Sequence, residues 1–362
     1  MKPLSIKTDI KNPSKMQLPG LNGLNFSSES IINARNAGQI QCLRLDLSYR
    51  CNINCSYCYT KYLFVKEKKE HSFEEIVNTI EQGIQLGIES VVLLGGEPLI
   101  YDRVYDILDY LHKQNIIPII FTNGIGLTDD IVSYLYRINA TVLIKNDGSQ
   151  KLQDELCGNG VGIKIRQGFQ KLLNYGFNTT LNGNLRMGCA TVVTNKNYSL
   201  MPELWRYLRD NCIYPHVERM TVFDVKLNEL SISHEQSLEL NKIFMKIDED
   251  EYGIVWDTPY PALCGFKCSI LFNGCHCNPY REVSICPEIK AEFNLYEQSL
   301  SEILCSEYFR KTRHIELHIK GHCKNCTHLV KAPCYGCRSK VLKKTNDLFA
   351  EDSDCPLIGN IK

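Results

Sequence analysis

The sequence predicts an α/β fold in which parallel strands form a partial barrel or an open sheet, followed by a smaller cysteine-dense domain. Several segments are continuously apolar, among them SVVLLG, IIPIIFT and ATVLIK, which is typical of strands buried on both faces of a parallel sheet. Helical patterns separate these segments, as expected for serial β/α units with right-handed crossovers. After Pro261 the chain becomes short-stranded, is interrupted by Gly and Pro, and is rich in cysteine.

The elements follow one another in a regular order after a polar lead-in, residues 1–40, which we expect to be extended or irregular. Six strands are predicted at Cys42–Ser48, Ser90–Leu94, Ile116–Thr122, Thr141–Lys145, Leu185–Val193 and Pro215–Phe223. Helices are predicted at Ser72–Leu86, which opens with a capping box, and at Val104–Lys113, Asp129–Tyr136, Lys164–Tyr175 and Pro202–Arg209. The barrel would then span residues 41–225, a charged helical linker 226–260, and the cysteine-dense domain 261–357.

Charge and composition exclude several classes of protein. The 362 residues include 41 Lys and Arg and 41 Asp and Glu, so no bulk charge favours nucleic-acid binding. No apolar run approaches the roughly 20 residues of a membrane span, and the N-terminus lacks the apolar core of a signal peptide. We therefore expect a cytoplasmic protein without nucleic-acid or membrane partners. Its 18 cysteines would be reduced there, which favours metal or cluster ligation over disulfides.

The first cysteine group lies directly after the first predicted strand. Cys51, Cys55 and Cys58 have the spacing C-x3-C-x2-C in the stretch LRLDLSYRCNINCSYCYT. Three thiolates on one loop can hold three irons of a [4Fe–4S] cluster and leave the fourth iron open. A zinc site, or three buried structural thiols, would explain the spacing alone equally well.

The neighbouring strand ends favour the cluster. The second strand ends in Gly95-Gly96-Glu97-Pro98 and the third in Thr122-Asn123-Gly124. With the cysteine loop, these motifs resemble the radical S-adenosylmethionine (SAM) superfamily. The resemblance implies a SAM-binding cluster, with Tyr57 near the adenine and Gly95, Gly96 and Glu97 near the methionyl amino group. Thr122 and Asn123 are further cofactor-binding candidates.

One position departs from the pattern of relatives that carry a cysteine-rich C-terminal domain. Where such relatives have a serine at the end of strand four and a later arginine, this chain has Lys145 and Cys157. The resemblance assigns these positions to the SAM carboxylate, so we expect Lys145 to supply the missing cation. The alternative is a solvent-exposed lysine, or one paired with Asp147.

The C-terminal cysteines admit two interpretations. The run Cys323-x2-Cys326-x7-Cys334-x2-Cys337 alone would indicate a zinc ribbon. Beside a radical SAM core, the set resembles the SPASM domain, which carries two auxiliary [4Fe–4S] clusters, so that the chain would hold three. The resemblance, which covers about residues 42–357, assigns one auxiliary cluster to Cys268, Cys275, Cys286 and Cys337. It assigns the other to Cys323, Cys326, Cys334 and Cys355.

Two details of this region stay open. Cys264 is the main rival for a ligand position, and Cys277 is left over. Arg281 stands where relatives often have the glycine of a turn, so we expect the chain to loop differently there.

The resemblance fixes hydrogen abstraction but not the substrate. One hypothesis is modification of a ribosomally made peptide by crosslinking, thioether formation or oxidation, although the lead-in is too short for a fused leader-recognition domain. The other is dehydrogenation or epimerisation of a small polar molecule, such as a sugar or aminocyclitol. A non-enzyme, either an iron–sulfur electron carrier or a zinc-ribbon module, would leave the GGEP and TNG motifs unexplained.

The remaining expectations concern the substrate class, the catalytic base, the hydrogen donor and the reductant. Sulfatase maturation is disfavoured because Pro287 stands where those maturases have an acidic base. Glu288 is the candidate catalytic base. Cys264, Cys277 and Cys189 are candidate hydrogen donors for an epimerase. A flavodoxin- or ferredoxin-type protein is the expected reductant.

Overall fold

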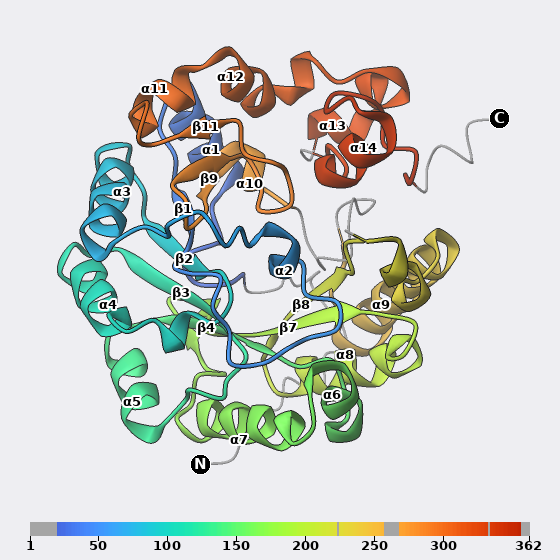
Figure 1. Ribbon diagram of the computed structural model, residues 1–362. Coiled ribbons are helices and arrows are strands. Elements are labelled where there is room, and N and C mark those ends of the chain that lie inside the picture. The colour runs from blue at the N-terminus through green and yellow to red at the C-terminus, as the bar shows by residue number, and fades with distance from the viewer. Residues whose placement is uncertain (1–19, 223, 257–267, 332–333, 356–362) are drawn as a thin grey trace.

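The fold is built on one curved, mostly parallel sheet whose convex face is covered by helices (Figure 1). The computed structural model describes residues 20–222, 224–256, 268–331 and 334–355. The sheet has the strand order β11-β10-β9-β1-β2-β3-β4-β7-β8. An α/β fold with a mostly parallel sheet, as predicted, is confirmed.

The parallel strands lie close to their predicted positions. They are β1 (Cys42–Asp46), β2 (Ser90–Leu94), β3 (Ile117–Thr122), β4 (Thr141–Lys145), β7 (Met187–Val193) and β8 (Tyr214–Arg219). Each pairs in parallel with the next. A separate two-stranded ribbon, β5 (Thr180–Leu181) and β6 (Asn184–Leu185), lies outside this sheet. All carboxyl ends of the parallel strands therefore meet at one rim, where α/β proteins place their sites.

Amphipathic helices return the chain between these strands. They are α3 (Phe73–Gln85), α4 (Val104–Lys113), α5 (Asp129–Arg137), α6 (Gln150–Cys157), α7 (Val161–Asn174) and α8 (Met201–Asp210). The predicted capping box of α3 is present, because Ser72 accepts from the Glu75 amide and Glu75 accepts from the Ser72 amide. Their apolar faces and the outer sheet face form the main core, which includes Leu45, Leu93 and Ile120.

The charged stretch after β8 forms the 19-residue helix α9 (His234–Tyr252), which packs on α8. Its contact centres on the buried carboxylate of Asp248, which accepts from the Trp205 indole at 2.7 Å and from the Arg209 guanidinium at 2.9 and 2.7 Å. The Trp205 ring stacks on Phe244 at 4.1 Å. The segment predicted as a linker is therefore an integral part of the helical layer.

The lead-in contains a helix that the sequence did not predict. α1 (Ser28–Asn36) begins at the cap Ser27 and buries none of its residues, so it has no apolar period to recognise. Arg35 holds it in place by donating to the Arg313 carbonyl at 3.0 Å and pairing with Glu316. The expectation of an irregular lead-in is therefore wrong for this part of it.

The cysteine-dense region continues the barrel sheet. β9 (Gly274–Cys277) pairs in parallel with β1, and β10 (Glu282–Ser284) and β11 (Phe293–Asn294) follow antiparallel. Gly274 permits this junction because a Cβ there would collide with the Cys42 carbonyl. The helices of this region are α10 (Ile270–Asn273), α11 (Leu300–Cys305), α12 (Glu307–Arg313), α13 (Thr327–Lys331) and α14 (Arg338–Thr345). They form the upper part of Figure 1.

The turn between β9 and β10 accommodates Arg281 directly. Arg281 has φ 60°, the left-handed conformation that glycine adopts most easily. Its guanidinium lies 4.9 Å from the Tyr296 ring centre and 3.6 Å from Glu75. The arginine therefore occupies a glycine-like turn, and its presence does not by itself require a different loop.

No helix among the described residues is both long and apolar enough to cross a membrane.

Candidate functional site

Cys51, Cys55 and Cys58 lie on a loop that leaves β1 at the carboxyl rim, and Cys51 is exposed. Burial raises the pKa of the Cys51 thiol, and negative charge on Glu97, Cys55 and Cys58 raises it further. The three thiols are therefore within electrostatic reach of one another. Among the described residues, no three potential ligand side chains already converge on a point that would hold an ion. The loop fits an iron–sulfur cluster by its donors, because such clusters are held by cysteine thiolates.

The C-terminus of α6 holds this loop. The Ser56 amide donates to the Leu156 carbonyl at 2.8 Å, and the Asn54 amide to the Cys157 carbonyl at 3.4 Å. The buried Cys157 thiol also hydrogen-bonds Cys55, and this contact, with the charge of Lys145, lowers the pKa of Cys55 to about 7. A lowered pKa favours the thiolate, which is the form that ligates metal.

The glycines after β2 serve the packing of the cluster loop. Gly95 has φ 113°, and a Cβ there would collide with the Ser48 carbonyl. A Cβ on Gly96 would collide with the Arg50 carbonyl. Instead, the Gly96 amide donates to Ser48 at 2.8 Å and the Glu97 amide to Arg50 at 3.0 Å. These glycines thus allow a close approach to the cysteine loop, and their place near the methionyl amino group stays a prediction.

Glu97 joins the rims of β2 and β3. Its buried carboxylate accepts from the Thr122 hydroxyl at 2.7 Å, from the Asn123 amide at 2.6 Å and from the Leu99 amide at 3.1 Å. Burial raises the pKa of Glu97, against the effect of these three hydrogen bonds. The Asn123 side chain donates in turn to Asn52 Oδ1 at 2.7 Å and lies 3.9 Å from Cys51 Sγ. Glu97, Thr122 and Asn123 therefore form one polar unit beside the cysteine loop.

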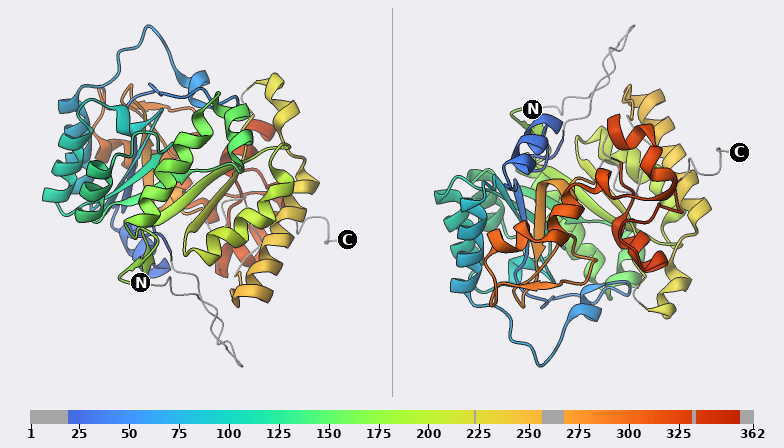
Figure 2. Two further views of the ribbon diagram at one scale, coloured as in Figure 1. Left: turned by 90° about the horizontal axis from the view of Figure 1, so that it is seen from below. Right: turned by 90° about the horizontal axis from the view of Figure 1, so that it is seen from above.

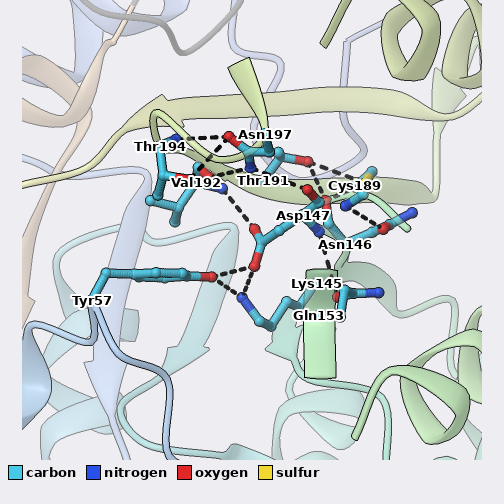
Figure 3. A network of polar contacts seen from close by, with 11 residues as sticks. Tyr57, Lys145, Asn146, Asp147, Gln153, Cys189, Thr191, Val192, Thr194 and Asn197 are labelled. Carbon is cyan, nitrogen blue, oxygen red and sulfur yellow. Dashed lines mark hydrogen bonds and ion pairs between the residues drawn. The ribbon is translucent and has the colours of Figure 1, made fainter. Parts of the chain in front are cut away.

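Lys145, at the end of β4, is paired with Asp147 and is not solvent-exposed. Its ammonium contacts the Asp147 carboxylate and the Tyr57 hydroxyl, and Tyr57 donates to the same carboxylate (Figure 3). The side chains of Lys145 and Asp147 are 14% and 0% exposed. Desolvation lowers the pKa of Lys145, but the charge of Asp147 outweighs it and the pKa is raised well above the usual value. The pair with Asp147 was one of the two alternatives left open by the sequence.

Asp147 is anchored from a neighbouring strand. The Val192 amide of β7 donates to Asp147 Oδ1 at 3.0 Å, and the Asn197 side chain donates to the Asp147 carbonyl at 3.1 Å (Figure 3). Lys145 and Tyr57 are thus held against a fixed carboxylate, next to Cys55.

The C-terminal cysteines fall into two groups. Burial raises the pKa of Cys286, and its thiol neighbours are Cys268 and Cys337. Burial raises the pKa of Cys334 to about 11, and its thiol neighbours are Cys355, Cys323 and Cys326. Cys337 is thus within electrostatic reach of Cys286, and Cys355 is within reach of Cys334. The assignment of these cysteines to two clusters stays a prediction.

Cys275 is apart from both groups. It is fully buried in β9, in register with Leu43, and belongs to the apolar core. The groups that perturb its pKa, after burial, are Arg44, Arg313 and Cys42. Cys277 points to the same face, because side chains alternate along a strand. Cys264 lies outside the described residues.

Glu288 lies between the cluster loop and the first C-terminal cysteine group. The Thr221 hydroxyl donates to its carboxylate. Burial raises the pKa values of Tyr59, Cys286 and Cys337, and the charge of Glu288 raises them further. Glu288 is therefore within electrostatic reach of both cysteine-bearing regions, and its catalytic role stays a prediction.

The structure adds a pair that the sequence did not suggest. Asp46, at the end of β1, and His276, in β9, are 0% and 3% exposed, and His276 Nε2 lies 3.1 Å from Asp46 Oδ2. Ser284 contacts the other ring nitrogen of His276 at 3.2 Å. Both oxygens of Asp46 lack a hydrogen-bonding partner among the described residues. The parallel pairing of β9 with β1 creates this pair. In the sequence, the only signal for it is that Asp46 ends an otherwise largely apolar strand.

The fold and this site define a class of protein. Residues 45–186 match the profile of the radical SAM superfamily, so the chain contains a radical SAM superfamily domain.

Particular relatives extend the match beyond that domain. A GTP 3',8-cyclase of Clostridium perfringens (strain 13 / Type A) is 26% identical over 267 residues, which cover 69% of this chain and 79% of the cyclase. Among solved structures, SuiB of Streptococcus suis bound to S-adenosylmethionine aligns with a TM-score of 0.65 at 19% identity, over 92% of this chain and 84% of SuiB. The structure of anSMEcpe with AdoMet and the Cp18Cys peptide aligns with a TM-score of 0.64 at 15% identity, over 86% and 93% of the two chains.

Proposed function

We propose that this protein is a radical SAM enzyme that cleaves S-adenosylmethionine reductively to a 5′-deoxyadenosyl radical and abstracts a hydrogen atom from its substrate. The observation that carries the proposal is the convergence of four consecutive strand ends. The cysteine loop follows β1, Gly95-Gly96-Glu97 follows β2, Thr122-Asn123 ends β3 and Lys145 ends β4. Hydrogen bonds join the cysteine loop to Gly96 and Glu97, and Glu97 to Thr122 and Asn123. Lys145 is joined to the cysteine loop through Tyr57.

The chain would hold its cofactors with these residues. Cys51, Cys55 and Cys58 would ligate a [4Fe–4S] cluster that, when bound with SAM, supplies the radical chemistry. Glu97 accepts three hydrogen bonds, and a carboxylate offers about four acceptor sites. One site remains for the SAM ammonium. Lys145 would neutralise the SAM carboxylate from its position beside Tyr57 and Cys55.

The C-terminal cysteines would hold two auxiliary [4Fe–4S] clusters in a SPASM domain. Cys323, Cys326, Cys334 and Cys355 supply four thiolates for one cluster. Cys268, Cys286 and Cys337 supply three for the other. Because Cys275 faces the apolar core, we propose that its rival Cys264 is the fourth ligand. Cys264→Ala should then lower bound iron, whereas Cys275→Ala should leave the iron content unchanged.

The favoured substrate is a ribosomally made peptide, which the enzyme would crosslink, cyclise through a thioether or oxidise. SuiB has been crystallised with the precursor peptide SuiA, and anSMEcpe with the Cp18Cys peptide. A small polar substrate is the alternative, favoured by the relative that is named as a GTP cyclase. In either case Glu288 would accept the substrate proton, because it lies between the SAM-binding loop and the auxiliary cysteines.

The decisive experiment measures 5′-deoxyadenosine. The reconstituted protein, reduced and supplied with SAM, should release it. The triple variant Cys51→Ala/Cys55→Ala/Cys58→Ala should not, while keeping the auxiliary iron. Cys305→Ala, which removes an exposed cysteine of α11, is the matched control.

Iron analysis separates the remaining alternatives. Three [4Fe–4S] clusters require about 12 iron atoms per chain. Saturation near four, with tightly bound zinc, would instead support a zinc ribbon. Release of 5′-deoxyadenosine by the triple variant would refute the proposed function, and absence of release by every form would support an electron carrier.

A further inference from the structure

The segment that follows the cluster loop is exposed and carries large apolar side chains. α2 (Thr60–Leu63) begins two residues after Cys58, and the chain then runs to α3. Tyr62, Phe64 and Val65 are 44%, 53% and 38% exposed. Figure 2 shows the segment between α2 and α3 projecting from the body of the molecule in both views. A cluster of exposed apolar side chains, unlike a single one, indicates an interaction surface.

The segment is held in a defined shape by the β9–β10 turn and by the cluster loop. The Val65 amide donates to the Tyr280 hydroxyl at 2.7 Å, and Lys68 pairs with Glu282. Glu70 accepts from the Ser48 hydroxyl at 2.7 Å and from the Tyr49 amide at 2.8 Å. A surface that is already ordered loses less entropy when a partner binds.

The charge of this surface is positive, although the whole chain is neutral. Residues 61–69 contain four lysines and one acid, which are Lys61, Lys66, Glu67, Lys68 and Lys69, and all five are exposed. Lys68 is occupied by Glu282. Lys66 and Lys69 form no ion pair with any described residue. The surface therefore combines apolar side chains with uncompensated cations, which complements an acidic protein.

The surface also adjoins the proposed cluster. The Lys61 ammonium donates to the Cys55 carbonyl at 2.5 Å, and Cys51 is itself exposed. The proposed function, on which this inference rests, requires one electron to reach the cluster in each cycle. Because electron transfer slows steeply with distance, the donor must dock beside the cysteine loop.

We propose that residues 61–69 form the docking surface for an acidic one-electron carrier protein of the flavodoxin or ferredoxin type. In the transfer, the reduced carrier loses one electron and the oxidised cluster gains it, and no bond is made or broken. Electron-transfer interfaces are small and short-lived. Three exposed apolar side chains, with lysines that attract an acidic partner, are therefore enough for such an interface. The lysines raise the rate of encounter, and Phe64 and Val65 provide the contact.

The test compares reduction of the reconstituted protein by two donors. Stopped-flow absorbance follows the cluster during reduction by flavodoxin hydroquinone and, separately, by a small photoreduced deazaflavin. Lys66→Glu/Lys69→Glu should slow the flavodoxin reaction about 10-fold or more at low salt. It should also abolish the salt dependence between about 0.05 and 0.5 M. Phe64→Ser should slow the reaction while keeping its salt dependence. Reduction by deazaflavin should be unchanged in every variant.

The matched control reverses two exposed charges at the opposite rim. Lys113 ends α4 and Arg137 ends α5, so both lie at the amino ends of the strands that follow. Lys113→Glu/Arg137→Glu should leave the flavodoxin rate within twofold of the wild type. An unchanged rate in Lys66→Glu/Lys69→Glu, or equal slowing in the control, would overturn the docking surface. Slowing with deazaflavin as well would overturn it too, because the cluster itself would then be altered. If deazaflavin fails to reduce the wild type, the proposed function fails instead.

Discussion

Replacement of Lys145 by Met tests the polar group between β4 and the cluster loop. In the wild type, Asp147 is completely buried and accepts from Val192 on one oxygen and from Lys145 and Tyr57 on the other. Lys145→Met removes the only cation that contacts this carboxylate among the described residues. Truncating one partner of a buried ion pair costs about 3–5 kcal/mol. We expect the lower end, about 3 kcal/mol, because the two other donors remain and the Lys145 side chain is 14% exposed.

The assay is urea unfolding of the protein, with SAM affinity measured by equilibrium binding. Lys171→Met is the matched control, because Lys171 pairs with Asp129 at 3.7 Å and these side chains are 35% and 75% exposed. It should cost less than about 1 kcal/mol. Lys145→Met/Asp147→Asn should recover part of the loss, since no uncompensated charge then remains. A loss in Lys145→Met no larger than in the control would refute the reasoning.

The same variant reports on SAM. A charge-assisted hydrogen bond contributes about 1.5–3 kcal/mol, so Lys145→Met should weaken SAM binding roughly 10- to 150-fold. Unchanged affinity would leave Lys145 with a structural role only. The ion pair also has a defined pH dependence. Because the pKa of Lys145 is raised in the folded state, its contribution is fully present below the ordinary lysine pKa of about 10.4. It is lost as the pH rises through the higher folded value.

Three further changes follow from the contacts. Gly96→Ala should prevent the β2 rim from closing on the Arg50 carbonyl. Soluble yield and cluster absorbance should therefore both fall below the wild-type values, and unchanged values would contradict this expectation. Arg209→Met removes the guanidinium that donates to the buried Asp248 carboxylate. It should lower the free energy of unfolding by about 3–5 kcal/mol, and a loss below about 1 kcal/mol would contradict this expectation. Truncation before Asp354 removes Cys355 and should eliminate about four of the iron atoms; Mössbauer or EPR spectra that still show all clusters would exclude Cys355 as a ligand.

The elements that were predicted well are those whose signal is local. β2 and β4 were placed to the residue, because each is a short apolar run bounded by polar or turn residues. α4 was also placed to the residue by its period. By contrast, α1 buries no residue and α6 is short, so neither shows an apolar stripe of useful length. Their stability comes from caps and from partners distant in sequence.

In the site too, motifs that are contiguous in the sequence could be predicted, whereas contacts between residues far apart in the sequence could not. The cysteine loop and the GGEP motif are recognisable in the sequence because their spacing carries the chemistry. The Asp46–His276 pair is not, because 230 positions separate its members and only the pairing of β9 with β1 unites them. The sequence shows only that Cys157 stands where relatives have an arginine. Its contact with Cys55 could not be predicted, because it depends on where α6 ends.

For Cys275, the local sequence pattern and the strand register favour different roles. Its motif, Cys275-His-Cys277, supported a ligand, but both cysteines belong to a strand. Alternation along β9 sends Cys275 and Cys277 toward the core with Leu43 and Leu45, and leaves His276 on the face of Asp46. The strand register is therefore the ground on which we propose Cys264, and not Cys275, as a partner of Cys286. It also places a buried histidine and a buried carboxylate where β9 meets the barrel.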